Sequence, residues 1–112
     1  MALTELTEFD FHARLARSPG VSLVIFSGPD CGGCRRLESL IPALAAGRAA
    51  HLYKVDVQKS TALAREYEVF HLPSLFLFVD GQFHAPLQVE PVPVKFADAI
   101  DRALSAPAHE EP

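Results

Sequence analysis

The sequence has few cysteines, little clustered positive charge and no long apolar run. Its ten basic residues are outnumbered by fourteen acidic ones, and Arg35-Arg36 is the only basic doublet. Phosphate binding needs a concentrated basic face, so this balance argues against nucleic acid as a partner. No apolar run approaches the length that spans a bilayer, and we therefore expect no membrane partner.

Cysteine is limited to Cys31 and Cys34. A bridge between residues so close in sequence closes a small ring and contributes little loop-closure stability. Residues 1–8 lack the basic flank and the apolar core of a signal peptide, so we expect a cytoplasmic location. Structural disulfides are rare in that reducing compartment, and the two cysteines must therefore have another role.

Length and composition predict a single domain. With 112 residues, 49% of them hydrophobic and 21% charged, the chain is too short for two stable cores but suits a compact globule. We assign this domain to residues 1–105 and expect the polar, proline-containing tail, residues 106–112, to be frayed. Nothing in the sequence indicates an oligomeric state.

Hydrophobic periodicity predicts short strands and amphipathic helices separated by proline and glycine. Strands are expected where apolar and β-branched residues run together or alternate, at 21–26, 51–57 and 75–79, and more weakly at 2–6. Helices are expected at 7–17, 31–47, 59–68 and 93–104. Asp80-Gly81 is a hairpin signal, so residues 82–89 should return antiparallel. This order predicts an α/β fold with a central mixed β-sheet flanked by helices on both faces.

Particular residues carry some of these predictions. Thr7 is expected to cap the first helix, with Phe9 and Leu15 on its apolar face. Pro42 is expected to kink the second helix. The last helix should bury the apolar residues that recur at helical spacing, which are Val94, Phe96, Ile100 and Leu104.

Cys31-Gly32-Gly33-Cys34 lies between a predicted buried strand and the start of a predicted helix. The free N–H groups and the positive end of the helix dipole favour an anion there, so Cys31 should ionise more readily than a free cysteine. Cys34 lies one turn further on, close enough to attack a mixed disulfide and release its other half. The two glycines permit this tight geometry. The pattern predicts thiol–disulfide chemistry.

A metal site is the competing interpretation of the two cysteines. Half a zinc site needs two further ligands, and the sequence has no second pair of cysteines at this spacing. The five histidines, at positions 12, 51, 71, 84 and 109, are not paired at ligand spacing. Redox chemistry is therefore favoured over metal binding, and neither a metal nor an organic cofactor is expected.

Three other motifs accompany the cysteine pair. Leu72-Pro73-Ser74 precedes the most apolar run, Asp80-Gly81 follows it, and Lys54 lies nineteen residues before Pro73. Together with Cys31-Gly32-Gly33-Cys34, these motifs resemble the cis-proline turn, the hairpin, the lysine beneath the active site and the active site of the thioredoxin family. The resemblance extends from about Leu6 to Leu104 and implies a thioredoxin fold.

This resemblance also implies where a substrate binds. It predicts a cis bond between Leu72 and Pro73, opposite the cysteines. Proline removes a backbone N–H and leaves neighbouring groups available to an extended substrate strand. We expect Pro29, His71, Leu72 and Pro73 to form the substrate-binding surface.

Two departures from the family pattern bear on the mechanism. Asp30 stands where the family usually has a tryptophan, and Ile25 stands in place of its buried aspartate. Ile25 should make the floor beneath Cys34 apolar, which hinders thiolate formation there by desolvation. Asp30 opposes the Cys31 thiolate by its charge, unless it is a solvated loop residue or a helix cap.

Two further residues are candidates for tuning the chemistry. Without the buried aspartate, Lys54 loses its usual partner, and we expect its ammonium group to lie in water. His71 should lie on the loop that faces the cysteines, where it would stabilise a thiolate or shuttle a proton. An exposed loop histidine without a chemical role is the competing interpretation.

The leading functional hypothesis is a protein disulfide reductase, with Cys31 as nucleophile and Cys34 as resolving thiol. Its substrates would be disulfide-containing proteins, and its electrons would come from a thioredoxin reductase or a similar donor. Two alternatives stay open: a thioredoxin-fold binding or assembly factor with little redox turnover, and a metal or iron–sulfur carrier that uses the two cysteines.

Overall fold

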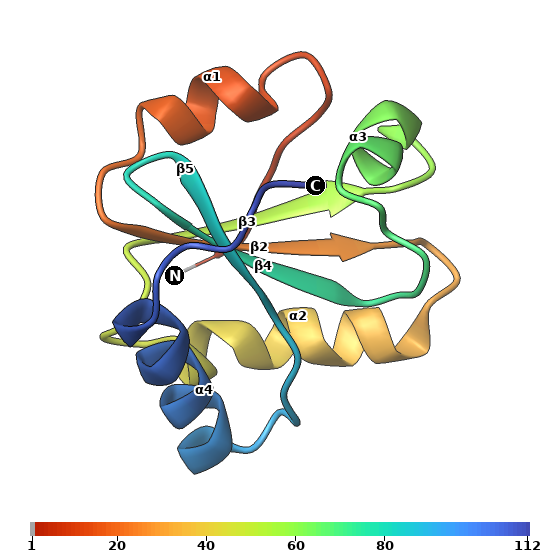
Figure 1. Ribbon diagram of the computed structural model, residues 1–112. Coiled ribbons are helices and arrows are strands. Elements are labelled where there is room, and N and C mark those ends of the chain that lie inside the picture. Colours follow the sequence, from red (N-terminus) through yellow and green to blue (C-terminus); the bar gives the residue numbers. More distant parts are fainter. Residues whose placement is uncertain (1) are drawn as a thin grey trace.

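The computed structural model describes residues 2–112, which form five strands and four helices (Figure 1). The strands are β1 (Thr4–Glu5), β2 (Val21–Ser27), β3 (His51–Asp56), β4 (Ser74–Val79) and β5 (Gln82–Leu87). The helices are α1 (Phe11–Ala16), α2 (Gly32–Leu44), α3 (Thr61–Glu66) and α4 (Pro93–Ser105). Their order along the chain is the predicted one. None of the helices within residues 2–112 is long and apolar enough to cross a membrane.

All five strands belong to one mixed sheet, in the order β1-β3-β2-β4-β5. β3 runs parallel to β1 and β2, whereas β4 runs antiparallel to β2 and β5. β2 is the central strand, and six of its seven residues are buried because they are covered on both faces. A strand covered in this way reads as a continuous apolar run rather than an alternating one.

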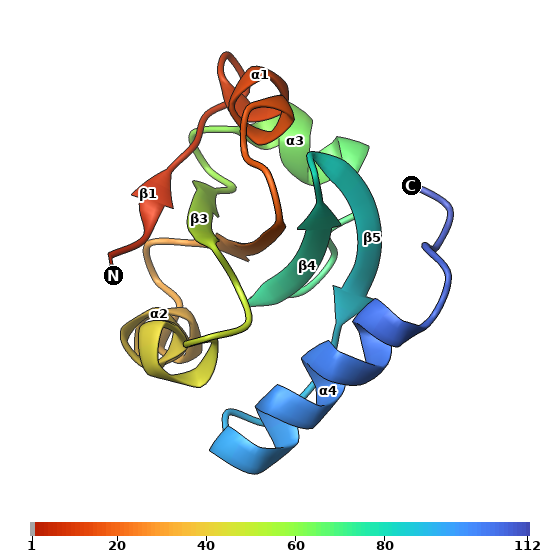
Figure 2. The same ribbon diagram turned by 90° about the vertical axis from the view of Figure 1, so that its left-hand side faces the viewer.

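Helices cover both faces of the sheet, so the predicted α/β class is confirmed. Figures 1 and 2 show α1 and α3 on one face and α2 and α4 on the other. The core under α1 and α3 is rich in aromatic rings, including Phe11, Phe26 and Tyr67. The core under α2 and α4 is largely aliphatic and includes Ile25, Leu37 and Ile41. The two cores fix β2 between them and so fix the point from which α2 begins.

The first helix is shorter than predicted. It begins after Asp10, because residues 8–10 form a turn in which the Thr7 carbonyl accepts hydrogen bonds from the N–H groups of Asp10 and Phe11, at 3.2 and 2.9 Å. Thr7 therefore starts this turn instead of capping the helix. Phe9 lies within the turn and is 91% exposed, so the prediction that it joins the core is wrong.

Other elements also end before their predicted limits. α2 stops at Leu44, α3 covers Thr61–Glu66 only, and β5 ends at Leu87. The predicted α2 end at residue 47 falls in a turn where Gly47 has φ of +78°. α4 starts at Pro93 as predicted and buries Phe96 and Ile100. Val94, however, is 79% exposed, contrary to its predicted place on the buried stripe.

Residues 106–112 have no helix or strand, and they are exposed. Beyond the end of α4, the N–H of His109 donates a hydrogen bond to the carbonyl of His84 at 2.6 Å, and the Tyr67 hydroxyl donates to Glu111 at 2.8 Å. Figure 2 shows the segment running from α4 alongside β5. Its fraying stays a prediction.

Candidate active site

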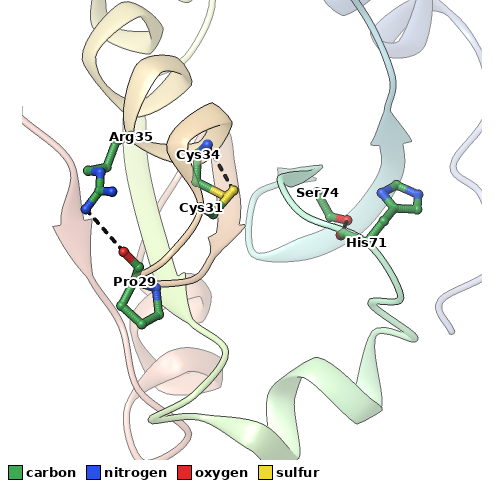
Figure 3. Close-up of a disulfide and its surroundings, with 6 residues drawn as sticks. All are labelled: Pro29, Cys31, Cys34, Arg35, His71 and Ser74. Atoms are coloured by element: carbon green, nitrogen blue, oxygen red, sulfur yellow. Dashed lines mark hydrogen bonds between the residues drawn. A yellow bond between two sulfur atoms is a disulfide. The ribbon is translucent and has the colours of Figure 1, made fainter.

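The two cysteines lie at the start of α2, directly beyond the end of the central strand β2. They form a disulfide, with their Cα atoms 5.2 Å apart (Figure 3). Cys31 is the N-cap residue of α2, and its sulfur accepts a hydrogen bond from the backbone N–H of Cys34 at 3.1 Å. The sulfur of Cys31 therefore meets a free donor of the first helical turn, in the place where a helix stabilises negative charge.

The two sulfur-bearing residues differ in burial. Cys34 is fully buried, whereas Cys31 is partly exposed. Cys34 belongs to the inward face of α2 with Leu37 and Ile41, which pack against Ile25 of β2. The buried face of α2 that carries Cys34 is therefore otherwise apolar. This difference makes Cys31 the cysteine that a bulky partner reaches first.

The loop before β4 lies opposite the cysteines. The peptide bond between Leu72 and Pro73 is cis, as the resemblance implied. A methyl group added at Gly33 would lie 4.0 Å from Cδ of Pro73, so the proline ring faces the segment between the cysteines. Leu72 approaches the loop that precedes the cysteines, since its Cδ1 lies 3.1 Å from the position of a Cβ at Gly28. The fold thus brings residues 72–73 and 28–34 together.

Pro29 and Asp30 form the turn that leads into α2, and both are exposed. The carbonyl of Pro29 accepts a hydrogen bond from Nη1 of Arg35 at 3.2 Å, which ties the turn to the helix (Figure 3). Asp30 does not cap α2, because Cys31 occupies the N-cap position. Asp30 is an exposed turn residue, and its effect on the thiolate of Cys31 stays a prediction.

His71 is exposed on the loop before Pro73. Its carbonyl accepts a hydrogen bond from the Ser74 hydroxyl at 2.7 Å, but its imidazole ring points away from the disulfide (Figure 3). The loop brings the backbone of His71 to the side of the molecule that carries the cysteines, but the path of the backbone turns the ring away from them. The structure does not bring His71 to the sulfur atoms.

Lys54 has a partner that its sequence neighbourhood did not predict. Its Nζ lies 3.5 Å from Oε1 of Glu38, and the two side chains are 37% and 21% exposed. The expectation of an unpartnered ammonium in water is therefore corrected. Helical spacing contains the relevant signal, because Glu38 lies four residues after Cys34 and so on the same side of α2.

Two hollows flank the loop that carries Pro73. One, of about 260 Å³, extends from Tyr67 and Pro73 to Val89, two residues beyond the end of β5. The other, of about 480 Å³, lies between α3 and Leu72. Phe70 lines both hollows and is 89% exposed, which gives the loop before β4 an apolar surface.

Within residues 2–112, no cluster of three or more histidine, cysteine, aspartate or glutamate side chains is arranged to hold a metal ion. The site as described consists of a disulfide at a helix start, an opposing proline loop and an ion pair on the adjacent strand and helix.

Comparison with known proteins agrees with this geometry. The family model for thioredoxin matches residues 2–102. The chain is 36% identical over 84 residues to thioredoxin from Staphylococcus aureus, which covers 73% of this chain and 79% of the relative. Among solved structures, the reduced thioredoxin pre-protein of Schistosoma mansoni matches 94% of this chain and 98% of its own, with a TM-score of 0.73 and 24% identity. A designed protein matches 93% of the chain with a TM-score of 0.77 and 17% identity.

The family match spans nearly the whole chain, and the cysteine pair and the cis-proline loop lie where the fold brings them together. The chain belongs to the thioredoxin family and is a protein-disulfide oxidoreductase.

Proposed function

We propose that the protein is a disulfide reductase in which Cys31 attacks the substrate and Cys34 resolves the mixed disulfide. The observation that carries this proposal is the difference between the two cysteines at the start of α2. Cys31 is partly exposed at the N-cap, whereas Cys34 is fully buried in the first turn. A large substrate therefore has access to the sulfur of Cys31 alone.

The reaction has two thiol-exchange steps. The thiolate of Cys31 attacks one sulfur of the substrate disulfide, which forms a mixed disulfide and releases the other sulfur as a thiolate. Cys34 then loses its proton and attacks Cys31, which forms the internal disulfide and releases the second substrate thiolate. The substrate gains two electrons, which the protein gives up. The oxidised product of these steps corresponds to the Cys31–Cys34 disulfide of the structure.

The surface around the cysteines suits an extended polypeptide. Leu72 and Phe70 are exposed apolar residues of the loop whose Pro73 ring faces Gly33, and Pro29 is exposed in the turn before Cys31. Burial of such side chains by a partner is favourable, while the backbone of a loop offers hydrogen bonds to a strand-like segment. We therefore assign disulfide-containing proteins as substrates, bound along residues 71–73.

A thioredoxin reductase or a similar donor would return electrons to the internal disulfide, and the cytoplasm is the compartment that supplies such donors. No organic cofactor is needed for exchange between thiols and disulfides. This part of the proposal follows from family membership and from the chemistry of the cysteine pair.

The test is reduction of insulin disulfides with dithiothreitol as the electron source. The wild-type protein should accelerate the reaction, and Cys31→Ser should abolish the acceleration because it removes the attacking sulfur. A wild-type rate equal to that of Cys31→Ser would reject the reductase and favour a binding or assembly factor.

The different roles assigned to the two cysteines predict a second outcome. Cys34→Ser should accumulate mixed disulfides with insulin chains on a non-reducing gel, since nothing resolves them, whereas Cys31→Ser should not. Equal accumulation in the two variants would contradict the assigned roles.

A further inference from the structure

Resolution requires the thiol of Cys34 to lose its proton in an unfavourable place. Cys34 is fully buried, and its inward neighbours on α2 and β2 are apolar. Burial among apolar groups disfavours the charged form of a thiol. The step therefore needs a proton acceptor close to Cys34.

A small hollow of about 270 Å³ lies beside the start of α2. Its charged lining comes from three elements: Arg35 and Glu38 of α2, Lys54 and Asp56 of β3, and Glu5 of β1. Its floor includes Ser27, Gly28 and Pro29, which lead from β2 to the cysteines. The hollow has room for water beside Arg35 and Glu38 of α2.

Most of these charged groups are engaged away from Cys34. The carboxylate of Asp56 accepts hydrogen bonds from the N–H groups of residues 58 and 59, at 2.8 and 3.3 Å. Glu5 lies 3.7 Å from Nζ of Lys59, and Arg35 donates to the carbonyl of Pro29. Glu38 is the one carboxylate of the hollow that belongs to the same helix as Cys34.

Helix geometry directs Glu38 toward Cys34. Residues four apart lie on one face of a helix, with Cβ atoms about 6 Å apart. Side chains lean toward the helix N-terminus, so Glu38 leans over the turn that contains Cys34.

Lys54 holds the carboxylate of Glu38 on that side. It is the register partner of Ile25 across β2 and β3, and therefore projects from the same face of the sheet as Ile25, beneath α2. Its Nζ then reaches Oε1 of Glu38 at 3.5 Å.

We propose that Glu38 accepts the proton of Cys34 during resolution, directly or through one water, with Lys54 as the positioning residue. This inference rests on the proposed reductase function and adds its proton acceptor. The S–H bond of Cys34 breaks as its proton moves to the carboxylate. The sulfur attacks Cys31, and the substrate sulfur leaves as a thiolate that takes up a proton from solvent. A proton acceptor placed within one water of a thiol is a general base.

The experiment separates the two steps with the symmetrical disulfide of thionitrobenzoate. This reagent releases one coloured thiolate when Cys31 attacks it and a second when Cys34 resolves the mixed disulfide. Reduced protein and reagent are mixed at equal concentrations in a stopped-flow instrument between pH 6 and pH 9. Glu38→Gln should slow the second release about tenfold at pH 7 and leave the first within about twofold. The difference in second-release rate between the wild-type protein and Glu38→Gln should shrink toward pH 9, where hydroxide from solvent takes the proton of Cys34.

Three variants make the comparison specific. Glu5→Gln removes the same charge from the same hollow and should leave both releases unchanged. Glu38→Asp keeps the carboxylate and should retain most of the second rate. Lys54→Met should slow the second release less than Glu38→Gln does, because it removes the ion pair that positions Glu38 but keeps the carboxylate.

The possible outcomes are distinct. A wild-type protein that releases no second thiolate would overturn both the reductase and this inference. If the wild-type protein releases both thiolates and Glu38→Gln releases the second one at the wild-type rate, this inference is overturned and the reductase function stands. Slowing of both releases alike, or slowing that is independent of pH, would identify a structural effect and would also overturn it.

Discussion

Ile25 determines the surroundings of the resolving cysteine. It is fully buried in the central strand, where it packs with Leu37 and Ile41 of α2. An apolar side chain here carries no desolvation cost, whereas a buried carboxylate without a partner is expensive. Lys54, its register partner on β3, is already paired with Glu38. The acidic side chain is therefore Glu38 on α2, where it is partly hydrated, and β2 stays apolar at residue 25.

Ile25→Asp should therefore lower the free energy of unfolding by roughly 2 kcal/mol or more. Ile25→Val, the matched control, removes one methylene and should cost about 1 kcal/mol. Urea unfolding at pH 7 measures both variants. The new carboxylate should also speed the second thiol release, since it lies in register with Lys54. An unchanged unfolding midpoint in Ile25→Asp would mean that residue 25 lies outside the core.

The hairpin between β4 and β5 connects the sheet to α1. Asp80 and Gly81 both have positive φ, +52° and +82°, as a tight hairpin turn requires. Asp80 also accepts a hydrogen bond from the N–H of Gly20 at 2.7 Å, which joins the turn to the segment before β2. A Cβ at Gly81 would lie 2.7 Å from the carbonyl oxygen of Leu15 in α1. Glycine is needed here for its conformation and also for the close approach of α1.

Gly81→Ala should consequently destabilise the protein by about 2–4 kcal/mol, because strain at positive φ adds to the clash with backbone. Gly47 is a matched control, since it has φ of +78° and nothing within 4 Å of an added Cβ. Gly47→Ala should cost only about 1 kcal/mol. Equal losses in thermal or urea unfolding would mean that α1 moves aside without cost.

At the scale of the whole molecule, the C-terminal segment spans the space between α4 and the residue that follows α3. Tyr67 lies in the aromatic core, 2% exposed, and its hydroxyl donates to Glu111 at 2.8 Å. Burial, and then the hydrogen bond to Glu111, raise the pKa of Tyr67 above its ordinary range. The buried phenol of Tyr67 therefore links the aromatic core to the C-terminal segment, which is far away in sequence.

This shift predicts how stability depends on pH. The pKa of Tyr67 in the folded state exceeds its value of about 10 in the unfolded chain, so its contribution is complete below that pH and is lost as the pH rises above it. Urea midpoints measured from pH 8 to pH 11 should fall above pH 10 in the wild-type protein. Tyr67→Phe should be less stable at pH 8 but should decline less steeply. Parallel curves for the two proteins would contradict this role.

Local sequence determined the order of elements, the hairpin turn and the position of the cysteines. These features depend on neighbouring residues: apolar runs such as Leu75–Val79, a turn signal at Asp80-Gly81 and a Cys-Gly-Gly-Cys segment between strand and helix. The cis bond before Pro73 was implied by resemblance to the family and is present. The order of elements, the hairpin turn and the position of the cysteines are readable from a few consecutive residues, because backbone conformation there depends mainly on local chemistry.

Tertiary structure alone decided which residues meet across elements. Phe9 and Val94 are exposed because no element packs over them, although their helical spacing suggested burial. The direction of the His71 ring follows from the path of its loop. Glu38 and Lys54 lie sixteen positions apart and meet only because α2 crosses the face of β3 on which Lys54 projects. Such pairs depend on register and on the side of the sheet that a helix covers, and these quantities are set by the packing of the whole core.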